Sequence, residues 1–191
     1  MEYQSILRNE DGERVMKPKY YIVFQSASKV SGQETLFTFE SKNDFIWAPF
    51  CDKNGRPVHH YERLKDIKPG DIILHQTMQK IQAISVAVSN CYSQILPEGV
   101  SFQGIDESGL RVNCKYYLLS VPVLPQRHEL AIQSYRLPKY NPYNVKWYAN
   151  QGYLYPIHDK LAEVFIDDAR NNNPELFKDM RFLNSEESEG F

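Results

Sequence analysis

The chain has 191 residues, of which 42% are hydrophobic and 24% are charged, the composition of an ordinary globular domain with a core of its own. It contains no apolar run of about 18 residues, which excludes a transmembrane helix, and its N-terminus lacks the charged-then-apolar order of a signal peptide. Three scattered cysteines are too few for a disulfide framework and predict a reduced, cytoplasmic protein.

The formal net charge of −2 is unevenly distributed. Residues 159–191 contain nine acidic and four basic residues, whereas residues 1–158 contain 18 basic and 15 acidic residues. A body with a net charge of +3 permits modest contact with phosphates without demanding it. Aromatic residues make up 13% of the chain, and 13 of them are Tyr, which suits either the binding of a polar planar ligand or plain core packing.

The first half of the chain predicts short strands. Residues 20–24 (YYIVF) form a β-branched and aromatic run typical of a buried strand, and residues 36–39 predict a weaker strand or a short helix. Between residues 45 and 92 the expected order is a short strand with Trp47, a helical segment, a reversal at Pro69-Gly70-Asp71, and a pair of strands at 72–75 and 81–88. This order indicates one side of a small barrel with a Trp at its mouth.

The second half adds one long strand and a helical end. Residues 110–123 predict a long strand, and Pro122 places its last part at a sheet edge. Residues 125–150 read as a structured surface loop, and residues 152–157 as a strand or an extended segment. The spacing of the apolar residues after His158 predicts an amphipathic helix, and Pro174 starts a further short one.

Trp47 has two readings. The strand stops at Ala48-Pro49, which predicts that the indole ring sits at an opening, where it can stack on a base; the alternative is a core anchor. Tyr92, Phe102 and Trp147 lie in predicted loops and are candidates for an opposing aromatic wall, or they simply cap the barrel.

The sequence shows no metal site and no catalytic constellation. Cys51, His59 and His60 lack the paired spacing of zinc ligands. His75 and Asp71 are four residues apart on a strand, about 13 Å, which is too far for a hydrogen bond. Nucleophile-elbow, phosphate-loop, HExxH and dinucleotide motifs are missing. We therefore expect a binding module that is not an enzyme and needs no cofactor.

The order YYIVFQSAS, IWAP, LKDIKPGDIILH and IQAISVAVSNCY resembles the EVE/YTH branch of the PUA-like superfamily. Gln25-Ser26 stand at the Lys-Ser position of the EVE pattern, Trp47 at its Trp and Gly70-Asp71 at its Gly-Asp pair. The layout, including QGYLYPI before a terminal helix, is also similar to the N-terminal domains of McrBC-type methylation-dependent restriction systems. The resemblance covers residues 20–125 well and 126–170 loosely.

The resemblance implies an α+β fold, a small mixed PUA-like β-barrel of five to six strands with flanking helices. It implies a lead-in over residues 1–19, an EVE/PUA-like domain over 20–170, and a helical segment with an acidic tail over 171–191 that leads to a further domain. It also implies a reader that flips a modified base out of double-stranded DNA into an aromatic pocket, alongside a GTPase motor of the AAA+ class and a partner nuclease.

The resemblance suggests two sets of site residues. The residues expected to bind the base are Trp47, Ser26, Ala27, Ser28, Ala48, His75, Tyr92 and Phe102. The residues expected to bind phosphates are Lys29, Arg56, Lys139 and Lys146. Ala27 stands where YTH readers carry an Asn that contacts the methylated base, so the identity of the base is not carried over. An RNA-binding or small-molecule-binding module on the same barrel is the alternative.

Overall fold

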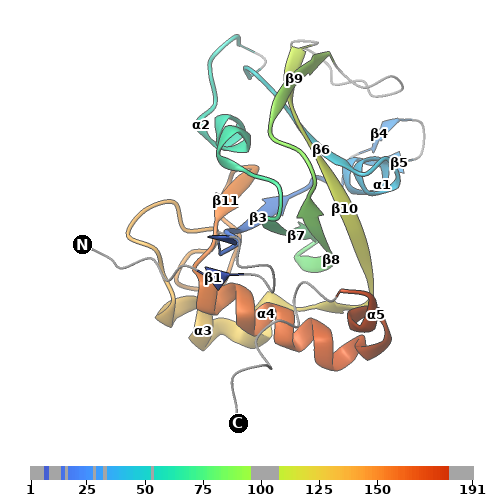
Figure 1. Cartoon of the computed structure of the whole chain (residues 1–191). Coiled ribbons are helices and arrows are strands. Elements are labelled where there is room, and N and C mark those ends of the chain that lie inside the picture. Colours follow the sequence, from blue (N-terminus) through green and yellow to red (C-terminus); the bar gives the residue numbers. More distant parts are fainter. Residues whose placement is uncertain are drawn as a thin grey trace.

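The computed structural model describes residues 7–8, 14–15, 17–27, 29–31, 34–52, 54–95 and 108–180 (Figure 1). The strands are β1 (Leu7–Arg8), β2 (Arg14–Val15), β3 (Tyr20–Phe24), β4 (Lys29–Ser31), β5 (Glu34–Thr35), β6 (Phe45–Pro49), β7 (Ile72–Thr77), β8 (Lys80–Ala87), β9 (Tyr92–Ile95), β10 (Ser108–Val123) and β11 (Leu154–Pro156). The helices are α1 (Leu36–Lys42), α2 (His59–Glu62), α3 (Glu129–Ser134), α4 (Asp159–Asn172) and α5 (Pro174–Asp179), with 3₁₀ turns η1 (Arg63–Asp66) and η2 (Pro125–His128).

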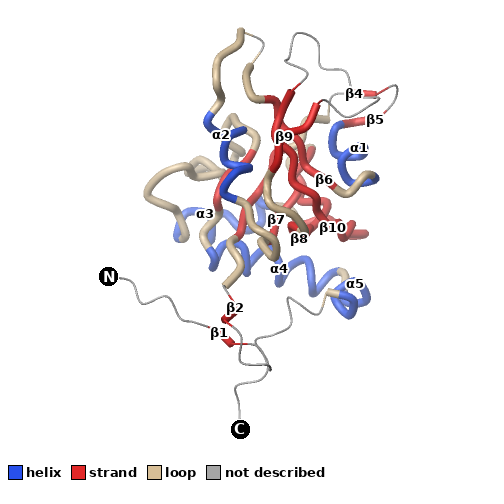
Figure 2. The backbone as a smooth tube through the Cα atoms, turned by 45° about the horizontal axis from the view of Figure 1, so that its top comes forward, coloured by secondary structure: helices blue, strands red, loops and turns tan. Residues whose placement is uncertain are grey.

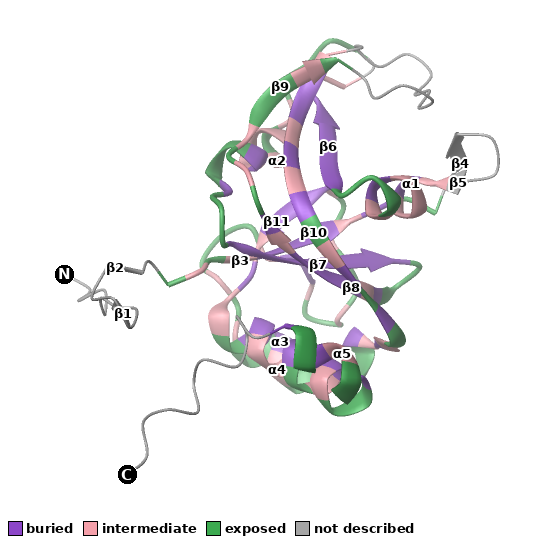
Figure 3. Cartoon of the chain, turned by 45° about the vertical axis from the view of Figure 1, so that its right-hand side comes forward, coloured by how far each residue is buried: buried purple, intermediate pink, exposed green. Residues whose placement is uncertain are grey.

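The main sheet has the strand order β11-β3-β7-β8-β10-β6, and β9 also pairs with β10. Strands β3 and β7 are parallel, and the other neighbours in this sheet are antiparallel. The sheet curls so that its two end strands, β11 and β6, approach the same region without pairing (Figures 1 and 3). The protein is thus an α+β fold built on a mixed half-barrel, which agrees with the predicted class, although the sheet order itself does not close.

The predicted reversal at Pro69-Gly70-Asp71 fixes the register of the parallel strands. Gly70 has a φ of +93°, a left-handed conformation that favours glycine. The Asp71 carboxylate then accepts the backbone N–H of Lys68 at 2.8 Å and that of Lys19 at 2.9 Å. Lys19 immediately precedes β3 and Asp71 immediately precedes β7, so one side chain aligns the starts of both strands.

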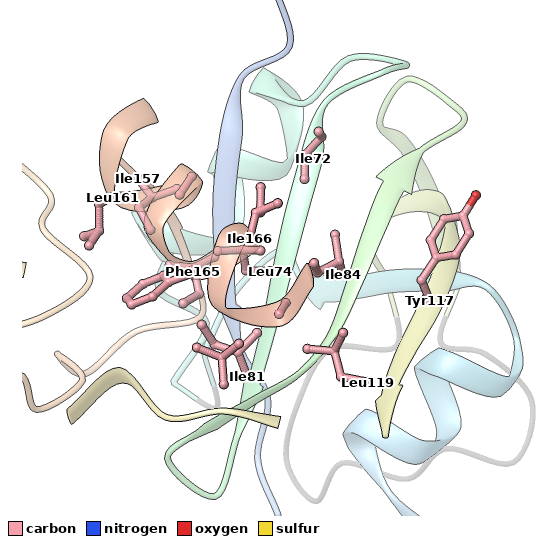
Figure 4. Close-up of a cluster of buried hydrophobic side chains, with 14 of the residues drawn as sticks. Ile72, Leu74, Ile81, Ile84, Tyr117, Leu119, Ile157, Leu161, Phe165 and Ile166 are labelled. Atoms are coloured by element: carbon pink, nitrogen blue, oxygen red, sulfur yellow. The ribbon is translucent and has the colours of Figure 1, made fainter. Parts of the chain in front are cut away.

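One face of the sheet packs against α4. The helix buries Leu161, Phe165 and Ile166, which repeat at helical spacing. They contact sheet residues that include Leu74 and Ile84 (Figure 4). Phe177 of α5 belongs to the same cluster, so this core extends beyond α4. Within the part of the chain that the structure describes, no helix is long and apolar enough to cross a membrane.

The opposite face forms the interior of the half-barrel. Its apolar part contains Val23, Ile46, Ile73 and Val112, one from each of four strands. Strand β8 places only small side chains on this face, at Ala83, Ser85 and Ala87. The interior therefore combines an apolar region with room for polar side chains from the neighbouring strands.

The secondary structure agrees with most of the predicted elements. It also decides between the alternatives left for residues 36–39 and 152–157. Residues 36–39 belong to helix α1, not to a strand, and α1 lies beside β6 and the short β4-β5 pair (Figure 2). The Thr35 hydroxyl caps this helix by accepting the Thr38 N–H at 3.2 Å. Residues 154–156 form an edge strand, and the long strand predicted at 110–123 begins at Ser108.

Candidate functional site

The carboxyl group of Glu40 joins the two ends of the curled sheet. Glu40 and Leu36, four residues apart, are the buried residues of α1. Glu40 Oε1 accepts the backbone N–H of Trp47 at 2.7 Å and the hydroxyl of Tyr153 at 3.1 Å. Trp47 lies on the edge strand β6, and Tyr153 directly precedes the other edge strand, β11. A single oxygen atom therefore bridges both edges of the half-barrel.

The hydrogen bonds continue from Glu40 into the interior of the half-barrel. Gln25 Nε2 donates to Glu40 Oε2 at 2.5 Å, and Gln25 Oε1 shares a hydrogen bond with His75 Nδ1 at 3.1 Å. The other ring nitrogen of His75 lies 2.7 Å from Ser85 Oγ. We call Gln25, Glu40, His75, Ser85 and Tyr153 the Glu40 cluster; each of the five is buried. They gather at one end of the interior from β7, β8, α1 and the ends of β3 and β11.

Burial shifts the ionisation of this cluster. It raises the pKa of Glu40 to about 8, although the hydrogen bonds from Gln25, Trp47 and Tyr153 act in the opposite direction. It lowers the pKa of His75 to about 3, so the imidazole is neutral. Burial, followed by the nearby Glu40 charge, raises the pKa of Tyr153 well above its ordinary value. Glu40 is therefore the member of the cluster whose charge changes near neutral pH.

Trp47 does not sit at an opening, and that prediction is wrong. Its exposed fraction is 2%, and it points away from the barrel interior toward the outer face of the sheet. A Cβ atom on Gly109 of β10 would lie 2.5 Å from the indole ring, so the ring lies flat over this glycine. The indole N–H reaches the Gln94 carbonyl oxygen on β9 at 3.4 Å. The indole thus packs against the outer face of β10.

Tyr92 and Trp47 lie on either side of Arg111, since both pair with it from opposite sides of β10. All three residues therefore lie on one face of the sheet, with Arg111 in the middle. The Tyr92 hydroxyl donates to Asn113 Oδ1 at 3.1 Å, and the Arg111 guanidinium lies 4.1 Å from the centre of the Phe45 ring. Phe102, the other candidate wall, lies outside the described residues.

The remaining residues predicted to contact a base divide between the interior and the surface. Ala48 is buried on the inner face of β6, and His75 belongs to the Glu40 cluster. Ser26 and Ala27 are exposed and directly follow Gln25 at the end of β3. Ser28 lies outside the described residues. The structure thus brings His75, the Trp47 backbone and the exposed pair Ser26-Ala27 around one end of the barrel.

Three of the four residues predicted to bind phosphates, Arg56, Lys139 and Lys146, are exposed. Lys139 precedes Tyr140, which lines a separate groove of about 540 Å³, and Lys146 lies further along the same loop. Arg56 is exposed in a turn, where its own backbone N–H donates a hydrogen bond to Asp52 Oδ1 at 3.0 Å. The side chain of Lys29 is not among those the structure describes. The groove itself was not expected from the sequence.

Of the five members of the Glu40 cluster, only His75 was among the residues predicted to form a site; Gln25, Glu40, Ser85 and Tyr153 were not. Glu40 occupies an apolar position of its helix, four residues after Leu36, and a charged residue at such a position is a signal of a buried polar contact. Tyr153 carries no comparable signal. Among the described residues no group of His, Cys, Asp and Glu side chains has the arrangement of a metal site.

We predict that both partners of the contact between Trp47 and Gly109 are needed for stability. Trp47→Ala should lower the free energy of unfolding by about 3–5 kcal/mol, because it empties a buried site. Gly109→Ala should lower it by about 1–3 kcal/mol, because the added methyl overlaps the indole ring and the Ala48 carbonyl oxygen. Urea denaturation measures both. Gly55→Ala is the control, since a Cβ there meets open space and adds only backbone strain; a wild-type midpoint for Gly109→Ala would contradict the position of the ring.

We predict that stability falls as the pH rises from about 6.5 to 8, because Glu40 is protonated in the folded protein and ionised in the unfolded chain. The fall should be on the order of 1.4 kcal/mol per pH unit at most. Below about pH 6.5, His75 makes stability rise with pH, because it is neutral in the folded protein and protonated in the unfolded chain. The range from pH 6.5 to 8 therefore reports on Glu40 without this contribution. Glu40→Gln should flatten the profile there, as measured by urea denaturation at several pH values; a slope that persists in this variant would assign the effect to another group.

No family model matches the chain, and no curated protein matches it. The NMR structure of Rpa0253 from Rhodopseudomonas palustris is 12% identical, covers 78% of this chain and 91% of its own, and has a TM-score of 0.44. A hypothetical protein from Leishmania major is 9% identical, covers 81% of this chain and 96% of its own, and has a TM-score of 0.48. The chain is thus similar in outline to these two proteins, and no family is assigned.

Proposed function

We propose that this chain is a PUA-like reader of modified DNA, which takes a modified base out of the duplex and binds it at the Glu40 cluster. The observation that carries the proposal is the cluster itself. Five buried hydrogen-bonding side chains occupy one end of a half-barrel whose remaining interior is mostly apolar. Tyr116 is the exception: its ring lies 4.2 Å from that of His75, and its hydroxyl donates to the Phe45 carbonyl oxygen at 3.0 Å. A satisfied buried polar network holds its donors and acceptors in one fixed arrangement, which suits the recognition of one hydrogen-bonding pattern in a ligand.

In the proposed complex, the base reaches the cluster from the exposed end of β3. Of the three residues that follow β3, Gln25 is buried, and Ser26 and Ala27 are exposed. A flipped base that displaces the Gln25 amide meets the carboxyl of Glu40 and the hydroxyl of Tyr153, which recognise the hydrogen-bonding edge of a base. Because the pKa of Glu40 is about 8, its carboxyl is largely protonated at neutral pH and both donates and accepts hydrogen bonds.

Trp47 has a different role in this proposal from the one that the sequence favoured. Its backbone N–H holds Glu40 in place, and its ring is packed against Gly109 on the outer face of the sheet. It is a positioning residue. The order of motifs that resembles the EVE/YTH branch supports the class of ligand, and the targeting of a restriction system with a GTPase motor and nuclease partner follows from that resemblance alone.

The proposal is tested by titrating the full chain with matched duplexes, unmodified or carrying 5-methylcytosine, hydroxymethylcytosine or N6-methyladenine. We expect one modified duplex to bind more tightly than the unmodified one. Ala27→Leu, which adds bulk next to Gln25, should reduce the ratio of the two affinities roughly tenfold or more. Ser134→Leu, at an exposed position of α3, is the matched control. Equal affinity for every duplex sinks the reader proposal, and tighter binding of a matched RNA selects the RNA alternative.

Lys139 and Lys146 provide a second prediction for the same complex. Both are exposed, and in the proposed complex they contact phosphates, which carry no sequence information. Neutralising both to Gln should weaken modified and unmodified duplexes alike and reduce the salt dependence of binding by about two released ions. Titrations at several salt concentrations measure this. A variant that lost only the preference for the modified duplex would place these lysines in the base pocket.

A further inference from the structure

The structure has a groove of about 540 Å³ that lies apart from the Glu40 cluster, and it carries a second inference. The groove is lined by residues of α2 and η1, by the start of β3, by the end of β11 and by Tyr140. The charged side chains on its walls are Lys19, Glu62, Arg63, Lys65 and Asp66. Both signs of charge and an aromatic ring therefore meet in one open depression.

Arg63 is held in a fixed position in this groove. One guanidinium nitrogen, Nη1, donates to the Leu154 carbonyl oxygen at 2.7 Å. The guanidinium lies 4.2 Å from the centre of the Tyr140 ring and 5.1 Å from that of Tyr155. A guanidinium carries five N–H donors, and within the described residues Arg63 makes no ion pair. A preorganised cation without a carboxylate partner is suited to a phosphate.

Lys19, directly before β3, adds a second positive charge to the lining of the groove. Its backbone N–H is held by Asp71, and its ammonium forms no ion pair with any residue that the structure describes. Lys65, in contrast, lies 3.3 Å from Glu62, so these two charges compensate each other. Lys19 and Arg63 are therefore two cations available to bind an anion, and the Asp66 carboxylate in the same groove can accept hydrogen bonds.

Tyr140 supplies a stacking surface. Its exposed fraction is 60%, and its φ is +59°, a left-handed conformation that is unfavourable for an aromatic residue. The loop holds it there, because the Asn141 side chain accepts the Leu137 N–H at 2.8 Å and donates to the Leu137 carbonyl oxygen at 2.6 Å. An exposed ring in a strained backbone conformation, next to the fixed guanidinium of Arg63, favours a role in ligand binding.

We propose that this groove binds one unpaired nucleotide unit, with its base stacked on Tyr140, its phosphate between Lys19 and Arg63, and a ribose hydroxyl or base amino group donating to Asp66. A bare phosphate leaves the ring and the carboxylate unused, whereas a nucleotide engages all of these groups. The site is independent of the base pocket at the Glu40 cluster, because it requires neither a modified base nor a duplex.

The experiment uses the full chain and a short, unmodified, fluorescein-labelled single strand of deoxyadenylate, with binding followed by anisotropy. We expect saturable binding that AMP competes for and that inorganic phosphate at the same concentration does not. Absence of binding at low salt, or equal competition by phosphate, overturns the proposal; in the second case the groove holds an anion only. Because no modified base is present, failure of the reader proposal leaves this result unaffected, and the reverse is also true.

Two variants with matched controls locate the site. Tyr140→Asn removes the ring and keeps a residue that tolerates the left-handed conformation, so the loop is retained; it should weaken binding roughly tenfold. Tyr148→Asn, on the same loop, should change binding little. Lys19→Gln should also weaken binding, whereas Lys80→Gln, at the exposed start of β8, should not. Equal losses in the test and control variants, with wild-type melting temperatures, overturn the assignment to this groove.

Discussion

The carboxyl group of Glu40 is the constraint on which the half-barrel depends. The curled sheet ends in two strands, β11 and β6, that do not pair with each other, and an unpaired edge leaves backbone N–H groups without partners. Glu40 satisfies one of these groups on β6 and binds the tyrosine that precedes β11. A buried carboxyl is costly, and three donated hydrogen bonds offset that cost. Helix α1 has only seven residues, too few to be stable alone, so the same contacts also keep it in place.

The long strand β10 belongs to two environments at once. Its C-terminal half carries Tyr117 and Leu119 on the face that α4 covers. Its N-terminal half carries Gly109, Arg111 and Asn113 on the same face, beyond the reach of α4. There the Trp47 indole packs on β10, since it reaches from β6 across Gly109 to β9. One face of β10 is thus covered by α4 along its C-terminal half and by Trp47 near its N-terminus.

Much of the fold was predictable from local patterns, and the site was not. The run at residues 20–24 and the reversal at Gly70-Asp71 are local signals, and the strands and the turn lie where they predict. The end of the strand after Trp47 was predicted correctly, but the exposure of its indole ring was not. The ring packs on Gly109, which belongs to a strand far away in the sequence, so its burial has no local signal. Glu40 resembles any charged residue of a short helix until Leu36 shows that it lies on the buried face. Tyr153 joins the cluster only through tertiary packing.

The clamp at Asp71 has a consequence for how the protein is made. Strand β3 pairs in parallel with β7, and the hydrogen bond that aligns them joins residues 52 positions apart. Parallel neighbours cannot form as a hairpin, and contacts so distant in sequence form slowly. Strands β7 and β8 are joined by a tight turn and assemble locally, with Asp71 already bound to Lys68. As the chain leaves the ribosome, β3 therefore has no place in the sheet until this hairpin has emerged. Until then its sequence, YYIVF, remains an apolar segment that is exposed to aggregation.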